Sequence, residues 1–157
     1  MKVSAQNIES GKEFQIESDG VNGDFLEKMS VFKMSDEKIK ELIGNLNISA
    51  DAKSLLYSFS KATIIAGKKI INIGKKIIDF ICYLFEEYPS ATFGMIFGAI
   101  AGVLVSTIPI LGVLLGPLLA PIAIFLGLTS GFYQDIKDKN LARRVAEINA
   151  EFSPLNA

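Results

Sequence analysis

Residues 88–134 read YPSATFGMIFGAIAGVLVSTIPILGVLLGPLLAPIAIFLGLTSGFYQ, which is 47 residues without a charged side chain. One helix needs roughly 20 apolar residues to cross about 30 Å of hydrocarbon, so the stretch has room for two crossings. Pro109 and Gly112 interrupt it near the middle, because proline removes a backbone donor and disfavours helix just before it. We therefore predict a transmembrane helical hairpin, with spans near residues 90–107 and 111–132.

Basic side chains flank this hairpin on both sides, whereas the turn between the two spans carries no charge. They are Lys68, Lys69, Lys75 and Lys76 before it and Lys137, Lys139, Arg143 and Arg144 after it. Positive flanks stay on the cytoplasmic side, so we predict a protein of the bacterial inner membrane with both termini in the cytoplasm. The alternative is a hairpin buried in a helical shell, as in pore-forming toxins, and we expect the remaining residues to be too few to cover it.

The composition argues against catalysis. The chain has 157 residues, with 16 basic and 17 acidic side chains, no histidine and a single cysteine, Cys82. These counts exclude Ser-His-Asp and Cys-His arrangements, histidine-bound zinc, thiolate clusters and internal disulfides. We predict no enzyme activity, no catalytic residue, no metal and no cofactor.

Small residues recur every four positions in both predicted spans, which allows another helix backbone to approach closely. The ridges contain Gly94, Gly98 and Gly102 in the first span and Gly112 and Gly116 in the second. We predict that they hold a homo-oligomer of about four to eight copies, an estimate that rests on this packing rule. Packing of the two spans within one chain is the alternative.

Prolines mark three positions of the hairpin. Pro109 lies at the predicted turn, and Pro117 and Pro121 lie four residues apart in the second span. Each of the latter two removes one backbone hydrogen bond and frees a carbonyl that must find another partner. We predict a kink in this span and assign the three prolines to a gate.

Residues 61–88 are predicted to form a basic amphipathic helix with a repeated heptad, GKKIINI at 67–73 and GKKIIDF at 74–80. Helical periodicity places the lysines on one stripe and the large apolar residues opposite, with Gly67 and Gly74 allowing a close helix crossing. Lysines at the bilayer centre cost about 2.5 to 3.5 kcal/mol each, so this helix does not span the membrane. We predict an anion-binding site at Lys68, Lys69, Lys75 and Lys76, and leave open that these side chains contact anionic lipid headgroups instead.

The predicted architecture is all-α, in four segments: an acidic cytoplasmic segment (1–50), the basic helical region (51–88), the hairpin (89–133) and a cytoplasmic C-terminal helix (134–157). Ser35 and Ser49 are expected N-caps of helices that begin after them. Leu141, Val145, Ile148 and Phe152 are expected to form one apolar face of the last helix, with Arg143 placed to pair with Glu147.

The lysines 68, 69, 75 and 76 beside Gly94, Gly98 and Gly102 give a layout that resembles small transmembrane effectors of bacterial antiphage defence, including the Hailong effectors. The resemblance implies an oligomeric membrane channel or pore that disrupts the host membrane. It also implies gating by a nucleotide or oligonucleotide ligand. The implied partners are the lipid bilayer and a signalling enzyme. A phage holin-like pore and a non-conducting membrane scaffold are the alternative functions.

Overall fold

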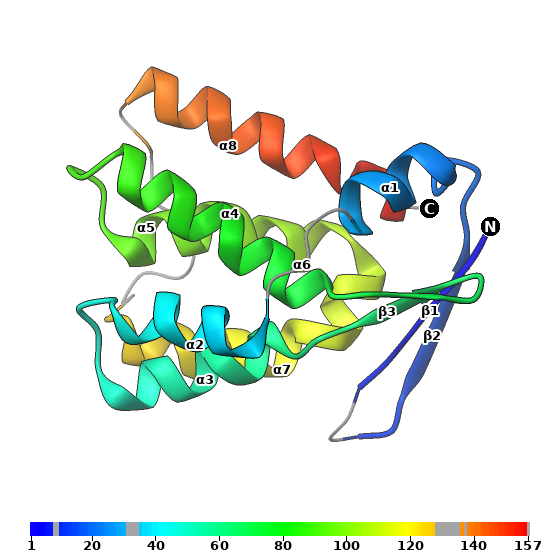
Figure 1. Cartoon of the computed structure of the whole chain (residues 1–157), viewed down its shortest axis with the longest axis horizontal. Helices are drawn as coiled ribbons and strands as arrows, with labels where there is room; N and C mark the ends of the chain where they lie inside the picture. Colours follow the sequence, from blue (N-terminus) through cyan, green and yellow to red (C-terminus); the bar gives the residue numbers. More distant parts are fainter. Residues whose placement is uncertain (8–9, 31–34, 128–135, 137, 157) are drawn as a thin grey trace.

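The computed structural model describes residues 1–7, 10–30, 35–127, 136 and 138–156 of the chain. Figure 1 shows its elements, which in chain order are β1 (Lys2–Gln6), β2 (Glu13–Glu17), α1 (Gly23–Ser30), α2 (Asp36–Gly44), α3 (Ala50–Ser60), β3 (Ile64–Ala66), β4 (Lys69–Ile71), α4 (Ile73–Glu87), α5 (Phe93–Phe97), the π-helical turn η1 (Gly98–Gly102), α6 (Val103–Thr107), α7 (Pro109–Phe125), α8 (Lys139–Glu151) and the 3₁₀ turn η2 (Ser153–Leu155).

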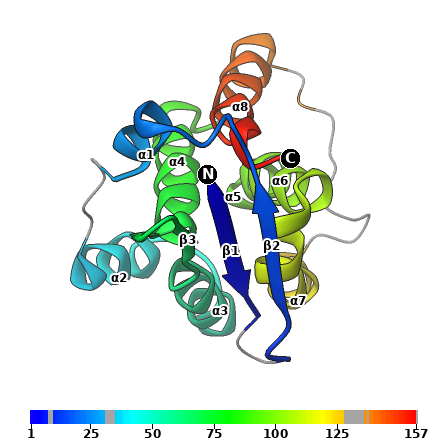
Figure 2. The same cartoon turned by 90° about the vertical axis from the view of Figure 1, so that its right-hand side faces the viewer.

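Two β-hairpins that are far apart in the sequence form one antiparallel sheet, with the strand order β2-β1-β3-β4. β1 joins the hairpins by pairing Val3 with Ala66 and Ser4 with Ile65. Because alternate residues of a strand point to the same side, Val3 and Ala66 are buried while Ile65 is exposed. Figure 2 shows the helices behind one face of the sheet. The fold is therefore mixed α/β, and the prediction of an all-α architecture is wrong.

The predicted long helix over residues 61–88 is interrupted by the second hairpin. Gly67 has a φ of +62° and begins a two-residue loop between β3 and β4, a position at which hairpin turns favour glycine. The flanking isoleucines are β-branched and suit strands. Helix resumes only at Ile73, so the heptad repeat describes two different structures.

The uncharged stretch forms the centre of the helical layer. α5, η1 and α6 follow one another directly, the chain turns at Ile108, and Pro109 begins α7 at a position where a missing backbone donor costs nothing. This confirms the predicted turn. α7 packs on α3 and on strands β1 and β2, while η1 contacts α4 and α8. The rest of the chain thus covers one side of the hairpin, more than we expected, while Ile124 and Phe125 at the end of α7 stay exposed.

None of the helices within the described residues combines the length and the apolar character that a membrane crossing requires. α7 has 17 residues and is about 25 Å long, less than the hydrocarbon thickness of about 30 Å. The predictions of two membrane spans, an inner-membrane location, and a transmembrane channel or pore are contradicted by this finding. The predicted end of the second span, 128–132, lies outside the described residues.

Several local predictions are confirmed. Ser35 accepts a hydrogen bond from the backbone N–H of Lys38 and caps α2, and Ser49 accepts one from Ala52 and caps α3, both at 3.1 Å. In α8, Leu141, Val145 and Ile148 are buried, as is Phe152 just after the helix. The predicted pair of Arg143 and Glu147 is also present, with 3.9 Å between Nε of Arg143 and Oε1 of Glu147.

Gly74 brings the first turn of α4 directly against the end of α3. Its N–H donates to the carbonyl oxygen of Ala62 at 3.0 Å. A Cβ at this position would overlap the carbonyl oxygen of Phe59 and lie 3.0 Å from the carbonyl carbon of Ser60. The close crossing predicted for Gly74 is therefore present, whereas Gly67 serves a turn.

Candidate anion-binding site

The four predicted ligand-binding lysines lie in two separate places. Lys68 and Lys69 are exposed at the tip of the β3–β4 hairpin, and Lys75 and Lys76 lie in the first turn of α4. The single helical stripe that was to align them does not form, because residues 64–71 are a hairpin.

Lys76 lies in acidic surroundings. Its ammonium is 4.8 Å from the ring centroid of Phe80, a cation–π contact. It also lines a hollow with three acidic side chains, Asp24, Glu27 and Glu151, and one other lysine, Lys28. Such surroundings do not favour binding of an anion.

Lys75 instead joins two lysines that come from other helices. Its ammonium lies 2.6 Å from a carboxylate oxygen of Asp36 on α2, and its side chain is 14% exposed. The hydrogen bond and charge of Lys75 lower the pKa of Asp36, with smaller contributions from the charges of Lys61 and Lys40. We call Lys40, Lys61 and Lys75 the lysine cluster.

The ring of Tyr57 occupies the middle of this cluster. The ammonium of Lys40 lies 5.0 Å from the ring centroid, and that of Lys61 lies 4.6 Å from it. Neither of these two lysines forms an ion pair with a described residue. Among the described residues, the carboxylate of Asp36 thus faces three ammonium groups, and Lys40 and Lys61 bring positive charge that no described carboxylate pairs with directly.

Sequence spacing indicated only part of the cluster. Lys61 and Lys75 belonged to the predicted lysine stripe, but Lys40 lies on α2 and has no sequence relation to them. Only the packing of α2 and α4 around α3 brings the three together. No periodic signal in the sequence identifies Lys40.

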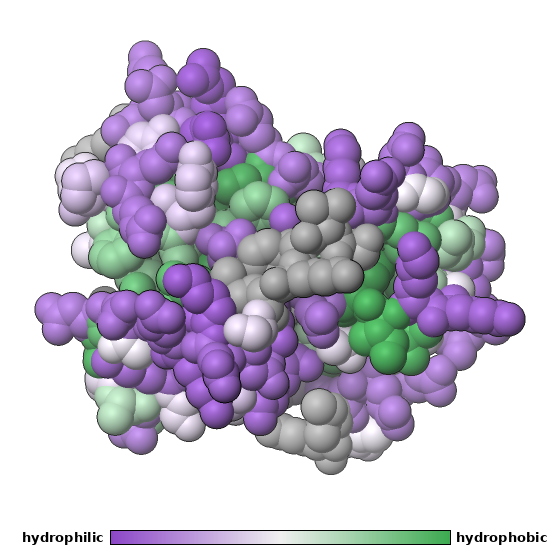
Figure 3. Space-filling view, in the orientation of Figure 1, coloured by the Kyte–Doolittle hydropathy of each residue, from purple (hydrophilic) through white to green (hydrophobic). Residues whose placement is uncertain are grey.

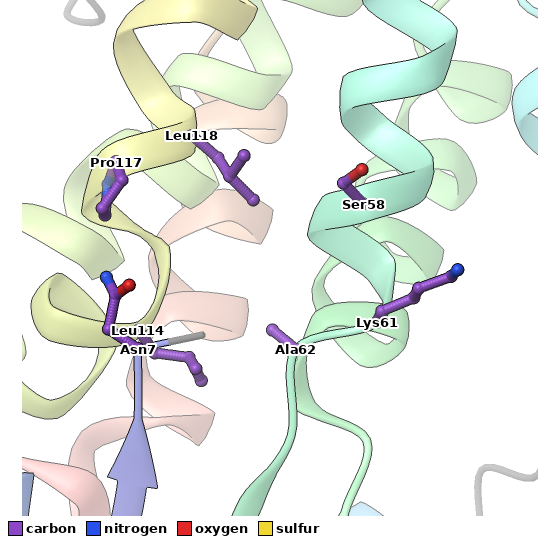
Figure 4. A pocket seen from close by; sticks show the side chains of 7 residues that line it. All are labelled: Asn7, Ser58, Lys61, Ala62, Leu114, Pro117 and Leu118. Atoms are coloured by element: carbon purple, nitrogen blue, oxygen red, sulfur yellow. The ribbon is translucent and has the colours of Figure 1, made fainter. Parts of the chain in front are cut away.

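A cavity of about 250 Å³ lies beside the cluster, between α3 and α7. Leu114 and Leu118 extend into it from α7, and Ser58 faces it from α3 (Figure 4). Its other lining residues are Asn7, Lys61, Ala62 and Pro117. An adjoining hollow of about 300 Å³ shares Lys61, Ala62 and Leu114 with it. In Figure 4 the Lys61 side chain extends from the end of α3 away from the two leucines, and its ammonium points away from the cavity.

The backbone carbonyl of Val113, which Pro117 leaves without its helical donor, accepts a hydrogen bond from Asn7 in the β1–β2 hairpin. Pro117 lacks the N–H that would bond the carbonyl of Val113 one helical turn earlier. The Nδ2 group of Asn7 donates to that oxygen at 2.9 Å. The Oδ1 of Asn7 accepts from the N–H of Ser10 at 3.1 Å, which holds the β1–β2 turn. We expected each freed carbonyl to bond to protein or to water, and the carbonyl of Val113 bonds to protein.

The five glycines assigned to oligomer packing differ in how deeply they are buried and in how close their neighbours lie. Gly94, Gly98 and Gly102 are buried inside a single copy of the chain. Gly112 lies where a Cβ would be 3.0 Å from the carbonyl oxygen of Val105, and Gly116 faces open space. The first three are therefore not on the surface of this fold, and self-association stays a prediction.

Figure 3 shows apolar surface over the β3–β4 hairpin, on a face that is otherwise mainly hydrophilic. Paired residues contribute to it, since Ile65 is 46% exposed and Ile70 is 67% exposed. This surface, together with the exposed Ile124 and Phe125 at the end of α7, is where self-association can be tested. Pro109 starts α7 and Pro117 and Pro121 lie inside it, and their assignment to a gate stays a prediction.

Reactive side chains are few within the described residues. No three His, Cys, Asp or Glu side chains there are grouped to hold a metal ion. Burial raises the pKa of Cys82 to about 12, so the thiol is protonated at neutral pH. Burial also raises the pKa of Asp79, which lines a groove between α4 and α8 with Tyr83 and Arg144.

Comparisons with protein-family models, with curated proteins and with solved structures find no match to this chain.

Proposed function

We propose that this protein binds a phosphate-bearing anionic ligand at the lysine cluster and acts by binding rather than by catalysis. The observation that carries the proposal is the positive charge of Lys40 and Lys61, which form no ion pair with a described residue and lie near the Lys75–Asp36 ion pair. Like charges held together repel one another, and an anion that bridges them relieves this repulsion.

The arrangement suits phosphate in particular. Lysine presents a compact charge on a flexible four-carbon stem, which allows several lysines to close around one phosphate group. Lys40 and Lys61 are exposed, so both can reach a ligand without any change in the core. Nucleotides and oligonucleotides, the ligand classes expected from the lysine-rich sequence, carry this same group.

Isothermal titration with pyrophosphate tests the proposal. We expect the double variant Lys40→Gln/Lys61→Gln to lose at least about tenfold in affinity, since each charge contributes roughly 1 kcal/mol or more at contact distance. Added salt should weaken binding to the unmodified protein, because exposed charges are screened.

The matched control is Lys38→Gln/Lys53→Gln, which removes two charges from the same helices, α2 and α3, outside the cluster. It should bind pyrophosphate nearly as well as the unmodified protein. Equal losses in the two double variants, or no binding of pyrophosphate to the unmodified protein, would refute the proposal.

A further inference from the structure

We infer that the ligand is amphipathic, with a hydrocarbon chain that occupies the cavity between α3 and α7 and a phosphate that lies at the lysine cluster. The inference rests on the proposed function, because it takes the anion site as given. It adds the chemical class of the rest of the ligand.

The walls of the cavity favour hydrocarbon. Leu114, Leu118, Pro117 and Ala62 supply apolar surface. The amide of Asn7 is engaged on both sides, by the carbonyl of Val113 and by the N–H of Ser10. Beside the Asn7 amide, the Ser58 hydroxyl and Lys61 are the polar groups of the wall, so a polar guest such as a nucleobase would replace few of the hydrogen bonds that it loses to water, which is unfavourable.

The two leucines are only partly buried, although they lie in the middle of α7. Covering their remaining apolar surface with a hydrocarbon chain is favourable. A hydrocarbon chain bound in this cavity would thus remove from water apolar surface of Leu114 and Leu118 that the fold leaves exposed.

Lys61 connects the cavity with the charge. This residue is among those that line the cavity, and its ammonium, which points away from the cavity in Figure 4, belongs to the cluster and lies over the ring of Tyr57. A ligand whose chain lies in the cavity beside Lys61 therefore ends near the positive charge. By comparison with the ~150 Å³ cavity that accepts benzene, about 250 Å³ has room for about ten carbon atoms.

Binding of n-alkyl phosphates with four, six and eight carbons, each below its micelle concentration, tests the inference by titration calorimetry on the full chain. We expect the affinity to rise up to about fourfold per methylene group, from the free energy of burying one methylene. Octanol, which has the chain without the charge, should bind at least about tenfold more weakly than octyl phosphate.

Two leucine substitutions on α3 provide a matched pair. Ser58 lines the cavity and is exposed, so Ser58→Leu should fill the space without disturbing the core and should remove the dependence on chain length while pyrophosphate still binds. Ser54 is exposed one turn earlier and does not line the cavity, so Ser54→Leu should keep that dependence.

The outcomes separate the two proposals. Pyrophosphate binding with equal affinities for all three alkyl phosphates, or ADP binding tighter than octyl phosphate, overturns the hydrocarbon inference and leaves the anion site standing. Absence of binding by pyrophosphate and by every alkyl phosphate overturns the proposed function itself. Equal binding of octanol and octyl phosphate retains the cavity but overturns its link to the lysines.

Discussion

The side chain of Asn7 should stabilise the fold by replacing the backbone donor that Pro117 cannot supply. Asn7 is 7% exposed, and its Nδ2 lies 2.9 Å from the carbonyl oxygen of Val113. Leaving a buried acceptor without a partner costs about 1 to 3 kcal/mol. We therefore expect Asn7→Ala to lower the free energy of unfolding by about 1 to 2 kcal/mol, since Val113 itself is only partly buried.

A double-mutant cycle with Pro117→Ala isolates this interaction. Alanine at position 117 restores an N–H one helical turn after Val113, which can donate to the same carbonyl. In that background Asn7→Ala should cost about 1 kcal/mol less than in the unmodified protein. The bond from Ser10 to Asn7 is lost in both backgrounds, so its contribution cancels in the cycle.

Urea unfolding followed by far-ultraviolet circular dichroism measures these differences, because the chain has no tryptophan for fluorescence. The melting temperature of Asn7→Ala should fall by about 2 to 8 °C, at about 2 to 4 °C per kcal/mol for a protein of this size. An equal cost of Asn7→Ala in both backgrounds would refute the assignment of Asn7 to the carbonyl freed by Pro117.

Two further predictions concern the core. Gly74→Ala should destabilise the fold by about 3 kcal/mol, because the new Cβ overlaps the backbone of α3. Gly44→Ala, at an open position in the last turn of α2, should instead stabilise it by about 0.5 to 1 kcal/mol in the same urea assay, and similar effects at both sites would contradict the close crossing. Asp79 has a raised pKa, so the folded state binds its proton more tightly and stability falls as pH rises from the unfolded-state pKa through the folded one. Asp79→Asn should therefore increase stability at pH 7 relative to the unmodified protein, with the gain shrinking toward pH 3, whereas a gain that does not vary with pH would contradict this origin.

Features that depend on neighbouring residues were readable from the sequence. The serine caps at positions 35 and 49 act within one helical turn, and the apolar face of α8 follows from helical spacing alone. The turn before Pro109 is equally local, because the proline ring itself restricts the preceding backbone.

The heptad repeat at 67–80 shows where local pattern was insufficient. The two heptads are nearly identical, but the first forms the turn and strand β4 of a hairpin and the second forms helix α4. β4 pairs with β3, which in turn pairs with β1, whereas α4 packs on the end of α3 at Gly74. Isoleucine and lysine are compatible with both structures, so tertiary contacts decide between them.

The environment of the uncharged stretch was also beyond the sequence pattern. A run of apolar residues satisfies the requirements of lipid and of a protein core alike, because both remove it from water. The sequence by itself predicted a helical hairpin near residues 90–107 and 111–132 with a turn between them, and the structure has helices over 93–107 and 109–125 with the turn at Ile108. Only the tertiary structure decided that the sheet, α3, α4 and α8 cover one side of this hairpin, and that three lysines from separate elements meet around Asp36 and Tyr57, because contacts between distant segments leave no periodic signal in the sequence.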